Sequence, residues 1–180
     1  TTQRWQKLRK ERVCNMNYHN ITVDDMLNGD GLRTVLWVSG CMHHCRGCQN
    51  PQTWDDKSGI PFDEAAKEEL FADLSRDYMD GITFSGGDPL CPANRETVGR
   101  LIAETRDRFP QKTIWLYTGD LFESFRDTLP FLPLIDVIVD GPYVEALRDV
   151  NLRWRGSKNQ RVIDVKQTLA TGKVVLWARN

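Results

Sequence analysis

Short apolar runs alternate with stretches of helical periodicity along most of the chain. Runs rich in apolar and β-branched residues predict strands at 34–38, 81–85, 113–117 and 134–139. Apolar residues at helical spacing predict helices from Asp63 to about Met79, from Asn94 to Phe109, and over 121–125. The pattern up to residue 139 is therefore strand then helix, repeated.

The last part of the chain continues this alternation. It predicts a short strand at 161–163, a helix over 164–169 that ends before Gly172, and a final strand at 173–177. Continuous apolar strands between amphipathic helices favour a parallel sheet covered on at least one face. About six such units are too few for a closed eight-stranded barrel. We therefore predict the α/β class, as an open partial (β/α)6-type barrel with a mostly parallel sheet.

Turns rich in glycine and aspartate follow the predicted strands. In parallel sheets of this kind, ligands bind beyond the carboxyl ends of the strands. The turns after the first four strands are therefore expected to share one rim. They begin at Gly40, Gly86, Thr118 and Asp140.

Three cysteines in the first of these turns are the main chemical signal. Cys41, Cys45 and Cys48 have the spacing Cys-x3-Cys-x2-Cys, and thiolates are soft ligands that favour zinc or iron–sulfur clusters. Three thiolates on a four-iron cluster would leave one iron open to a substrate. A zinc ion completed by His43 or His44 is the alternative. The residues alone leave both metals open.

Composition and charge narrow the class of protein. The 180 residues are 40% hydrophobic and 27% charged, with a formal net charge of −1, which predicts a single globular domain and gives no indication of nucleic acid or an anionic membrane as partner. Residues 1–15 form a basic, acid-poor extension before Met16, expected to be disordered or foreign to the domain at 16–180. The apolar runs are too short for a membrane span, and clustered cysteines suit a reducing compartment, so we expect the cytoplasm.

The chain carries three motifs in order, which are Asn28-Gly29-Asp30-Gly31-Leu32-Arg33-Thr34, the cysteine motif ending at Asn50, and Ser85-Gly86-Gly87-Asp88-Pro89. Together they resemble the radical S-adenosylmethionine enzymes, and within them the family that activates anaerobic (class III) ribonucleoside-triphosphate reductases. The resemblance extends from about Met16 to the end of the chain. It implies an oxidoreductase with a [4Fe-4S] cluster on Cys41, Cys45 and Cys48 and S-adenosylmethionine on the open iron.

The resemblance also implies the reaction, the partners and the remaining site residues. Reductive cleavage of S-adenosylmethionine would give a 5′-deoxyadenosyl radical, which abstracts hydrogen from a glycine of the reductase. The partners would be that reductase and a one-electron donor such as flavodoxin or ferredoxin. No protein acid, base or nucleophile is needed beyond the cluster ligands. The expected S-adenosylmethionine contacts are Gly47, Cys48, Gln49, Gly86, Gly87 and Asp88.

Two alternatives and one departure from the family pattern accompany this interpretation. The protein could activate another enzyme, such as pyruvate formate-lyase, or be a zinc-binding interaction module without enzymatic activity.

The family commonly has an aromatic residue next to the third cysteine, where this chain has Gln49. Gln49 is expected to bond the edge of the adenine, or Trp54 to supply the missing face. Asp140 and Tyr117 end strands and are equally compatible with ligand contact and with a role in the turn.

Overall fold

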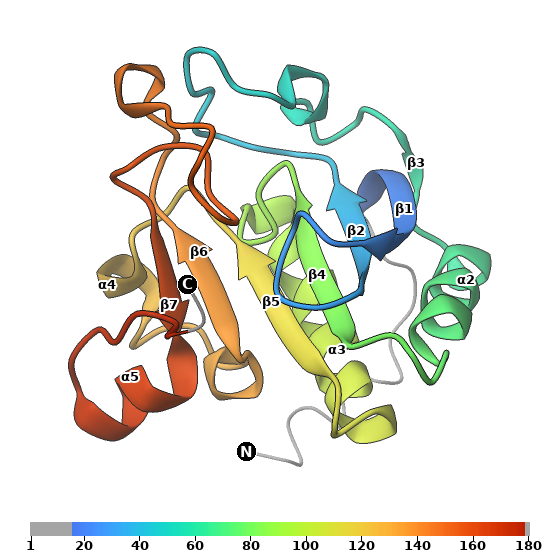
Figure 1. Cartoon of the computed structure of the whole chain (residues 1–180). Helices are drawn as coiled ribbons and strands as arrows, with labels where there is room; N and C mark the ends of the chain where they lie inside the picture. Colours follow the sequence, from blue (N-terminus) through green and yellow to red (C-terminus); the bar gives the residue numbers. More distant parts are fainter. Residues whose placement is uncertain (1–15, 179–180) are drawn as a thin grey trace.

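A seven-stranded mixed sheet forms the centre of the molecule in a computed structural model that describes residues 16–178 (Figure 1). The expectation for residues 1–15 lies outside this range. The strands are β1 (Asn17–Asp25), β2 (Arg33–Val38), β3 (Ile60–Pro61), β4 (Gly81–Gly86), β5 (Thr113–Tyr117), β6 (Val137–Asp140) and β7 (Arg161–Asp164). The helices are α2 (Glu64–Leu74), α3 (Pro92–Arg108), α4 (Phe122–Phe125) and α5 (Val165–Thr171), with 3-10 turns η1 (Pro51–Thr53), η2 (Leu132–Leu134) and η3 (Glu145–Leu147).

The strand order across the sheet is β3-β1-β2-β4-β5-β6-β7. β2, β4, β5 and β6 run parallel, whereas β1, β3 and β7 join by antiparallel pairing. The sheet is not closed. β7 and α5 also follow the predicted alternation, but β7 is antiparallel to β6, so the structure does not confirm a barrel of six parallel strand–helix units. The parallel centre aligns the ends of β2, β4, β5 and β6, and it is there that a site is expected.

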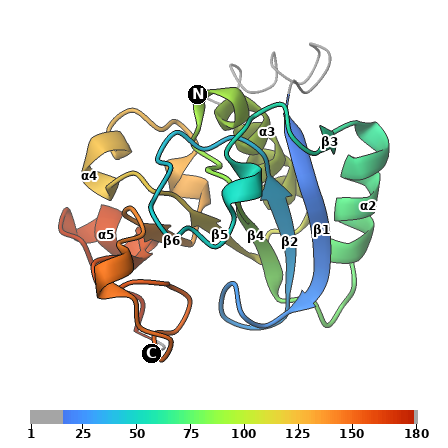
Figure 2. The same cartoon turned by 90° about the horizontal axis from the view of Figure 1, so that it is seen from above.

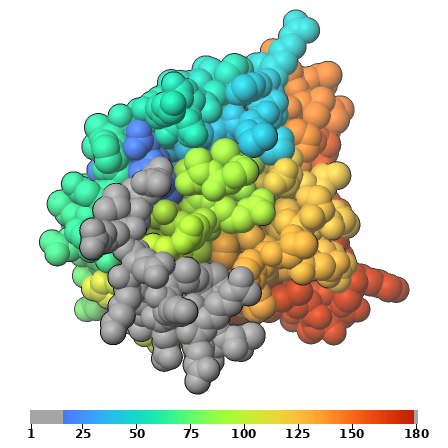
Figure 3. Space-filling model, turned by 180° about the vertical axis from the view of Figure 1, so that it is seen from behind, coloured from blue at the N-terminus to red at the C-terminus, as the bar shows by residue number. Residues whose placement is uncertain are grey.

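One face of the sheet carries the larger core. Side chains from all four helices pack against alternate strand residues such as Leu36, Phe84, Leu116 and Ile138, all fully buried. Figure 2 shows the curved sheet and its helices from above. Figure 3 shows the molecule from behind, where the surface formed by residues 90–100 lies between the surfaces formed by residues 50–70 and 120–130. This helical layer leaves the opposite face of the sheet for the site.

The opposite, inner face has a smaller aromatic core. Trp115, Val137, Val139, Trp154 and Val162 pack together there, with Tyr117 and Trp177 at the margin. The rings of Trp115 and Trp154 lie edge to face, with centroids 5.1 Å apart. Trp154 comes from the strap, by which we mean the irregular segment 141–160 between β6 and β7. The strap therefore covers part of the inner face.

Several element boundaries differ from the sequence prediction. α2 ends at Leu74 rather than near Met79, because the apolar periodicity stops there and Tyr78 is exposed. β6 begins at Val137 rather than at 134, since residues 132–134 form a proline-containing 3-10 turn. The predicted strand 173–177 is reduced to a single bridge between Leu176 and Ile163. β1 and β3 have no counterpart in the prediction.

None of the helices within residues 16–178 combines the length and the apolar character that a membrane crossing requires.

Candidate iron–sulfur site

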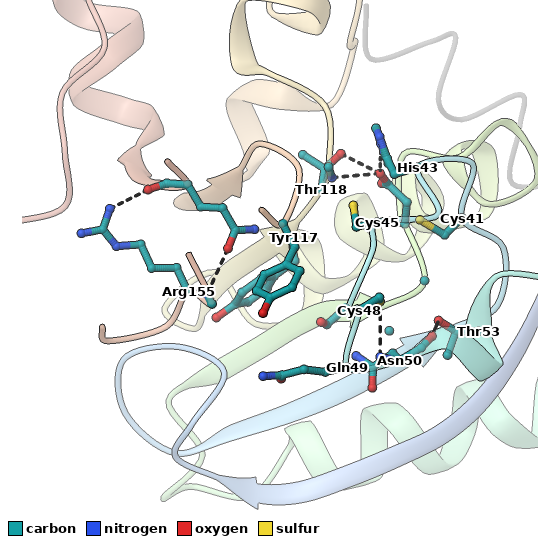
Figure 4. Close-up of a pocket in the computed structure, with 18 of the residues that line it drawn as sticks. Cys41, His43, Cys45, Cys48, Gln49, Asn50, Thr53, Tyr117, Thr118 and Arg155 are labelled. Carbon is teal, nitrogen blue, oxygen red and sulfur yellow. Dashed lines mark hydrogen bonds and ion pairs between the residues drawn. The ribbon is translucent and has the colours of Figure 1, made fainter. Parts of the chain in front are cut away.

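A pocket of about 510 Å³ lies at the carboxyl ends of the parallel strands. Its walls come from the turns after β2, β4, β5 and β6, together with the strap and the loop between β1 and β2. Figure 4 shows the cysteines on one side of the pocket, Arg155 on the other and Tyr117 between them. The prediction that the four turns share one rim is therefore confirmed.

The cysteine loop, residues 40–54, is closed at its base by backbone hydrogen bonds. The N–H of Gly40 donates to the carbonyl of Thr53 over 2.7 Å, and the N–H of Cys41 donates to the carbonyl of Trp54 over 3.0 Å. Gly47 has a φ of +73°, a conformation that glycine adopts without the penalty of a side chain. The loop is thus held at both ends, with the three cysteines between them.

All three cysteines are free thiols that are partly buried and line the pocket. Burial raises the pKa of Cys41 to about 11, although backbone N–H groups of His43 and His44 oppose this shift. The N–H of Asn50 donates to Sγ of Cys48 over 3.3 Å. Such donors stabilise thiolates that bind metal and tune a cluster's reduction potential. No fourth cysteine lines the pocket among residues 16–178, so the donor set fits a cluster with one position open.

The two histidines of the loop have different surroundings. His43 Nε2 lies 3.0 Å from Asp88 Oδ2 and 3.4 Å from Asp120 Oδ1. The hydrogen bond that His43 donates to the Asp88 carboxylate raises the pKa of His43. His44 is exposed, and its ring centroid lies 4.8 Å from that of Trp54. His43 is thus engaged with carboxylates, which does not favour it as the fourth ligand of a zinc ion.

Asp88 connects three segments of the rim. Its Oδ1 accepts the N–H of Leu90 over 2.8 Å, and its Oδ2 accepts the hydroxyl of Thr118 and the N–H of Gly119, each over 3.0 Å. With His43 at the same Oδ2, the carboxylate joins the turns after β2, β4 and β5. Asp88 is only 3% exposed. Its observed partners are therefore protein groups, and its contact with S-adenosylmethionine stays a prediction.

Gly86 and Gly87 let the turn after β4 approach the start of the cysteine loop. A Cβ on Gly87 would lie 2.5 Å from the carbonyl oxygen of Gly40, and one on Gly86 would lie 2.8 Å from backbone atoms of Val38. The N–H of Asp88 also donates to the Gly40 carbonyl over 2.7 Å. The glycines therefore serve a backbone–backbone contact, in addition to the ligand contact that the sequence predicted.

Gly87→Ala is expected to displace the cysteine loop and to lower the iron retained by the protein severalfold, because backbone atoms cannot move aside as a side-chain end can. Iron and protein assays after anaerobic reconstitution measure the iron retained per chain. Gly172→Ala is the control, since Gly172 has a φ of +72° but nothing within 4 Å of its Cβ position. Equal iron in both variants would contradict the role of the contact.

The remaining predicted contacts differ in their relation to the pocket. Gln49 is exposed and lines the pocket. Trp54 lines it too, and its Nε1 is buried without a partner among the described residues. Gly47 is outside the lining set, because its turn faces Glu145, whose Oε1 would lie 2.8 Å from an added Cβ. Asp140 is fully buried, accepts the N–H of Phe122 over 2.8 Å and pairs with Arg161. Asp140 therefore stabilises the turn after β6 and does not contact a ligand.

Asn94, at the start of the second predicted helix, was expected to cap it, but it lies inside α3 and supports the site. Its side-chain amide donates to the carbonyl of Ser39 over 2.7 Å and to that of Asp88 over 2.9 Å. Cys91 holds the N-cap position instead, with Pro92 first in the helix. Proline is favoured at that first position, so Pro92 was the signal in the sequence. The prediction also missed the pocket positions of Trp37, Tyr143 and Gln160, which lack a sequence motif of their own.

Comparison with known proteins agrees with this site. Residues 27–163 match the family model for a 4Fe-4S single cluster domain. The anaerobic ribonucleoside-triphosphate reductase-activating protein of Enterobacteria phage T4 is 46% identical over 82% of this chain and 93% of its own length. The proteins of the same name from Escherichia coli K12 and Vibrio cholerae are 44% and 42% identical, over 97% and 96% of their lengths. This chain therefore belongs to the family of anaerobic ribonucleoside-triphosphate reductase-activating proteins.

Proposed function

We propose that the protein binds S-adenosylmethionine at its iron–sulfur cluster and installs a glycyl radical on an anaerobic ribonucleoside-triphosphate reductase. The observation that carries this proposal is the set of three thiols on one wall of an open pocket, without a fourth cysteine among the described lining residues. When bound, the cluster supplies one electron that cleaves S-adenosylmethionine to methionine and a 5′-deoxyadenosyl radical, which takes a hydrogen atom from the glycine. The chain's own residues bind, orient and shield these groups.

Cys41, Cys45 and Cys48 would each hold one iron. The turn at Gly86 and Gly87 lines the pocket beside them and can present backbone carbonyls to the ammonium group of S-adenosylmethionine. Asp88 adds a negative charge at the same place. This arrangement supports a position for the methionine part of the cofactor between the cysteine loop and the turn after β4.

Gln49 and Trp54 are the candidates for contact with the adenosyl group. Both line the pocket from the end of the cysteine loop. The Nε1 of Trp54 is buried without a partner in the part of the chain that the structure describes, and such a donor gains stability when a ligand acceptor reaches it. We therefore assign Trp54 the larger share of adenine binding, with Gln49 at the edge of the base.

The electron must come from a one-electron donor, for which flavodoxin and ferredoxin are the candidates. Cysteine thiols stay available to metal in a reducing compartment, so we place the protein in the cytoplasm. The family membership favours the ribonucleotide reductase over pyruvate formate-lyase as the enzyme that is activated. It also favours the iron–sulfur cluster over a zinc ion at the cysteines.

Mixing the reconstituted protein with the anaerobic reductase tests the proposal. With S-adenosylmethionine and a one-electron reductant, we expect 5′-deoxyadenosine to form and a glycyl radical to appear by electron paramagnetic resonance. The radical should require both proteins. Pyruvate formate-lyase in place of the reductase is the control for the alternative target. Absence of the radical in the complete mixture, or its appearance only with pyruvate formate-lyase, would refute the assignment.

A further inference from the structure

Tyr117 has a hydroxyl group that the fold does not satisfy. The residue ends β5, lines the pocket, and its Oη is buried without a hydrogen-bond partner among residues 16–178. A buried hydroxyl without a partner costs about 1–3 kcal/mol. Polar groups of this kind in a native structure call for an explanation, and here the hydroxyl belongs to a residue in the wall of the pocket that the three cysteines line.

The surroundings of Tyr117 keep its hydroxyl neutral. The ring packs at the margin of the aromatic core formed by Trp115, Val139 and Trp154. Burial raises the pKa of Tyr117, while the positive charge of Arg33 opposes the shift. A neutral phenol can both donate and accept a hydrogen bond. When a bound segment excludes water from the pocket, the natural complement of this hydroxyl is another neutral polar group, since a charged partner would have to lose its hydration.

Two exposed apolar residues indicate that a polypeptide covers the mouth of the same pocket. Leu27, in the loop after β1, is 81% exposed, and Val150, in the strap, is 79% exposed. Both line the pocket, although more than one hundred residues separate them in the sequence. Apolar side chains that flank a binding pocket and face water are typical of a surface that a protein partner covers. A small molecule held on the inner wall would leave them exposed.

We propose that the Tyr117 hydroxyl binds the backbone of the glycine-bearing segment of the reductase, by donating to a peptide carbonyl next to the glycine. This inference rests on the proposed function and names how its protein substrate is held. Tyr117 lies between Arg155 and the cysteines in Figure 4 and lines the same pocket as the cysteines, so a segment held by Tyr117 would lie close to the cluster site. Leu27 and Val150 contact the segment where it enters.

Tyr117→Phe removes the donor and keeps the ring. We expect the affinity of the cluster-loaded protein for the anaerobic reductase, measured anaerobically by calorimetry without reductant, to fall about tenfold, which corresponds to about 1.4 kcal/mol. The number of glycyl radicals formed per 5′-deoxyadenosine should fall as well, because the segment is held less often in reach. The dissociation constant for S-adenosylmethionine alone should not change.

Tyr78→Phe is the matched control, because Tyr78 is 53% exposed and is not among the residues that line the pocket. A Tyr117→Phe protein with wild-type affinity for the reductase and wild-type radical yield would overturn the inference. Weaker binding of S-adenosylmethionine in that variant would overturn it too, since the hydroxyl would then serve the cofactor's ribose. The proposed function itself fails if the wild-type protein forms no glycyl radical. That result differs from a failure of the inference, in which the wild-type protein forms the radical and Tyr117→Phe behaves like it.

Discussion

Replacing Cys45 with alanine is expected to remove the iron–sulfur cluster and with it every activity of the protein. Cys45 is the central thiol of the loop and lines the pocket between Cys41 and Cys48. Two thiolates do not hold a cubane cluster stably in an open site. Iron should therefore fall from about four atoms per chain to near zero after anaerobic reconstitution, and formation of 5′-deoxyadenosine should fall to background.

Cys91→Ala is the matched control for the loss of a thiol. Cys91 is a free, partly buried cysteine at the start of α3 and is outside the lining of the pocket. Its variant should retain its iron and its 5′-deoxyadenosine formation. Wild-type iron content in Cys45→Ala would show that another residue serves as ligand. Loss of iron in both variants would instead indicate general damage to the fold.

Arg33→Met is expected to cause the largest loss of stability among single substitutions outside the site. The guanidinium is fully buried and donates to the hydroxyls of Thr83 and Thr113, and to the carbonyls of Asp30, Ile82 and Thr113, over 2.7–2.9 Å. Burial lowers its pKa to about 10, yet it remains charged at neutral pH. Methionine fills similar space but leaves these acceptors without donors.

We expect this variant to lose about 3 kcal/mol or more of unfolding free energy, because each buried acceptor left without a partner costs about 1 kcal/mol or more. Urea unfolding followed by circular dichroism under anaerobic conditions measures the difference. Lys173→Met is the control, since Lys173 is exposed and should change stability by no more than about 0.5 kcal/mol. A loss in Arg33→Met as small as in the control would contradict the structural role of the guanidinium.

Local patterns predicted the parallel centre of the fold well. The runs at 34–38, 81–85 and 113–117 are strands in the structure. Asp63 caps α2 with its side chain, and Gly172 ends α5 in the left-handed conformation. These features depend on residues close in sequence, whose periodicity and capping chemistry act without knowledge of the rest of the chain.

Features that depend on distant partners were missed or misread. β1 carries many partly exposed residues, and it becomes a strand through pairing with β2 and β3. β7 turns antiparallel because the strap returns the chain to β6 from the opposite direction. Asn94 follows the rule for helix caps, but its partners are carbonyls of Ser39 and Asp88. Sequence spacing alone does not reveal such contacts.

In the candidate site, too, the features set by nearby residues were predicted and those set by distant partners were not. The cysteine spacing and the two glycines located the correct rim, because each strand end carried its own turn signal. The role of Asp88 in joining three turns, and the unpaired hydroxyl of Tyr117, depend on which side chains meet in space. No sequence motif predicts either feature.

The closed base of the cysteine loop has a consequence for the protein after oxygen has destroyed its cluster. The hydrogen bonds from Gly40 to Thr53 and from Cys41 to Trp54 involve the backbone alone, and the core lies on other elements. The fold therefore does not require metal, in contrast to small zinc domains that unfold without it. A protein stripped of its cluster by oxidation should remain folded, with its ligands still in place, and a cell could repair it by delivering iron and sulfide rather than by making a new chain.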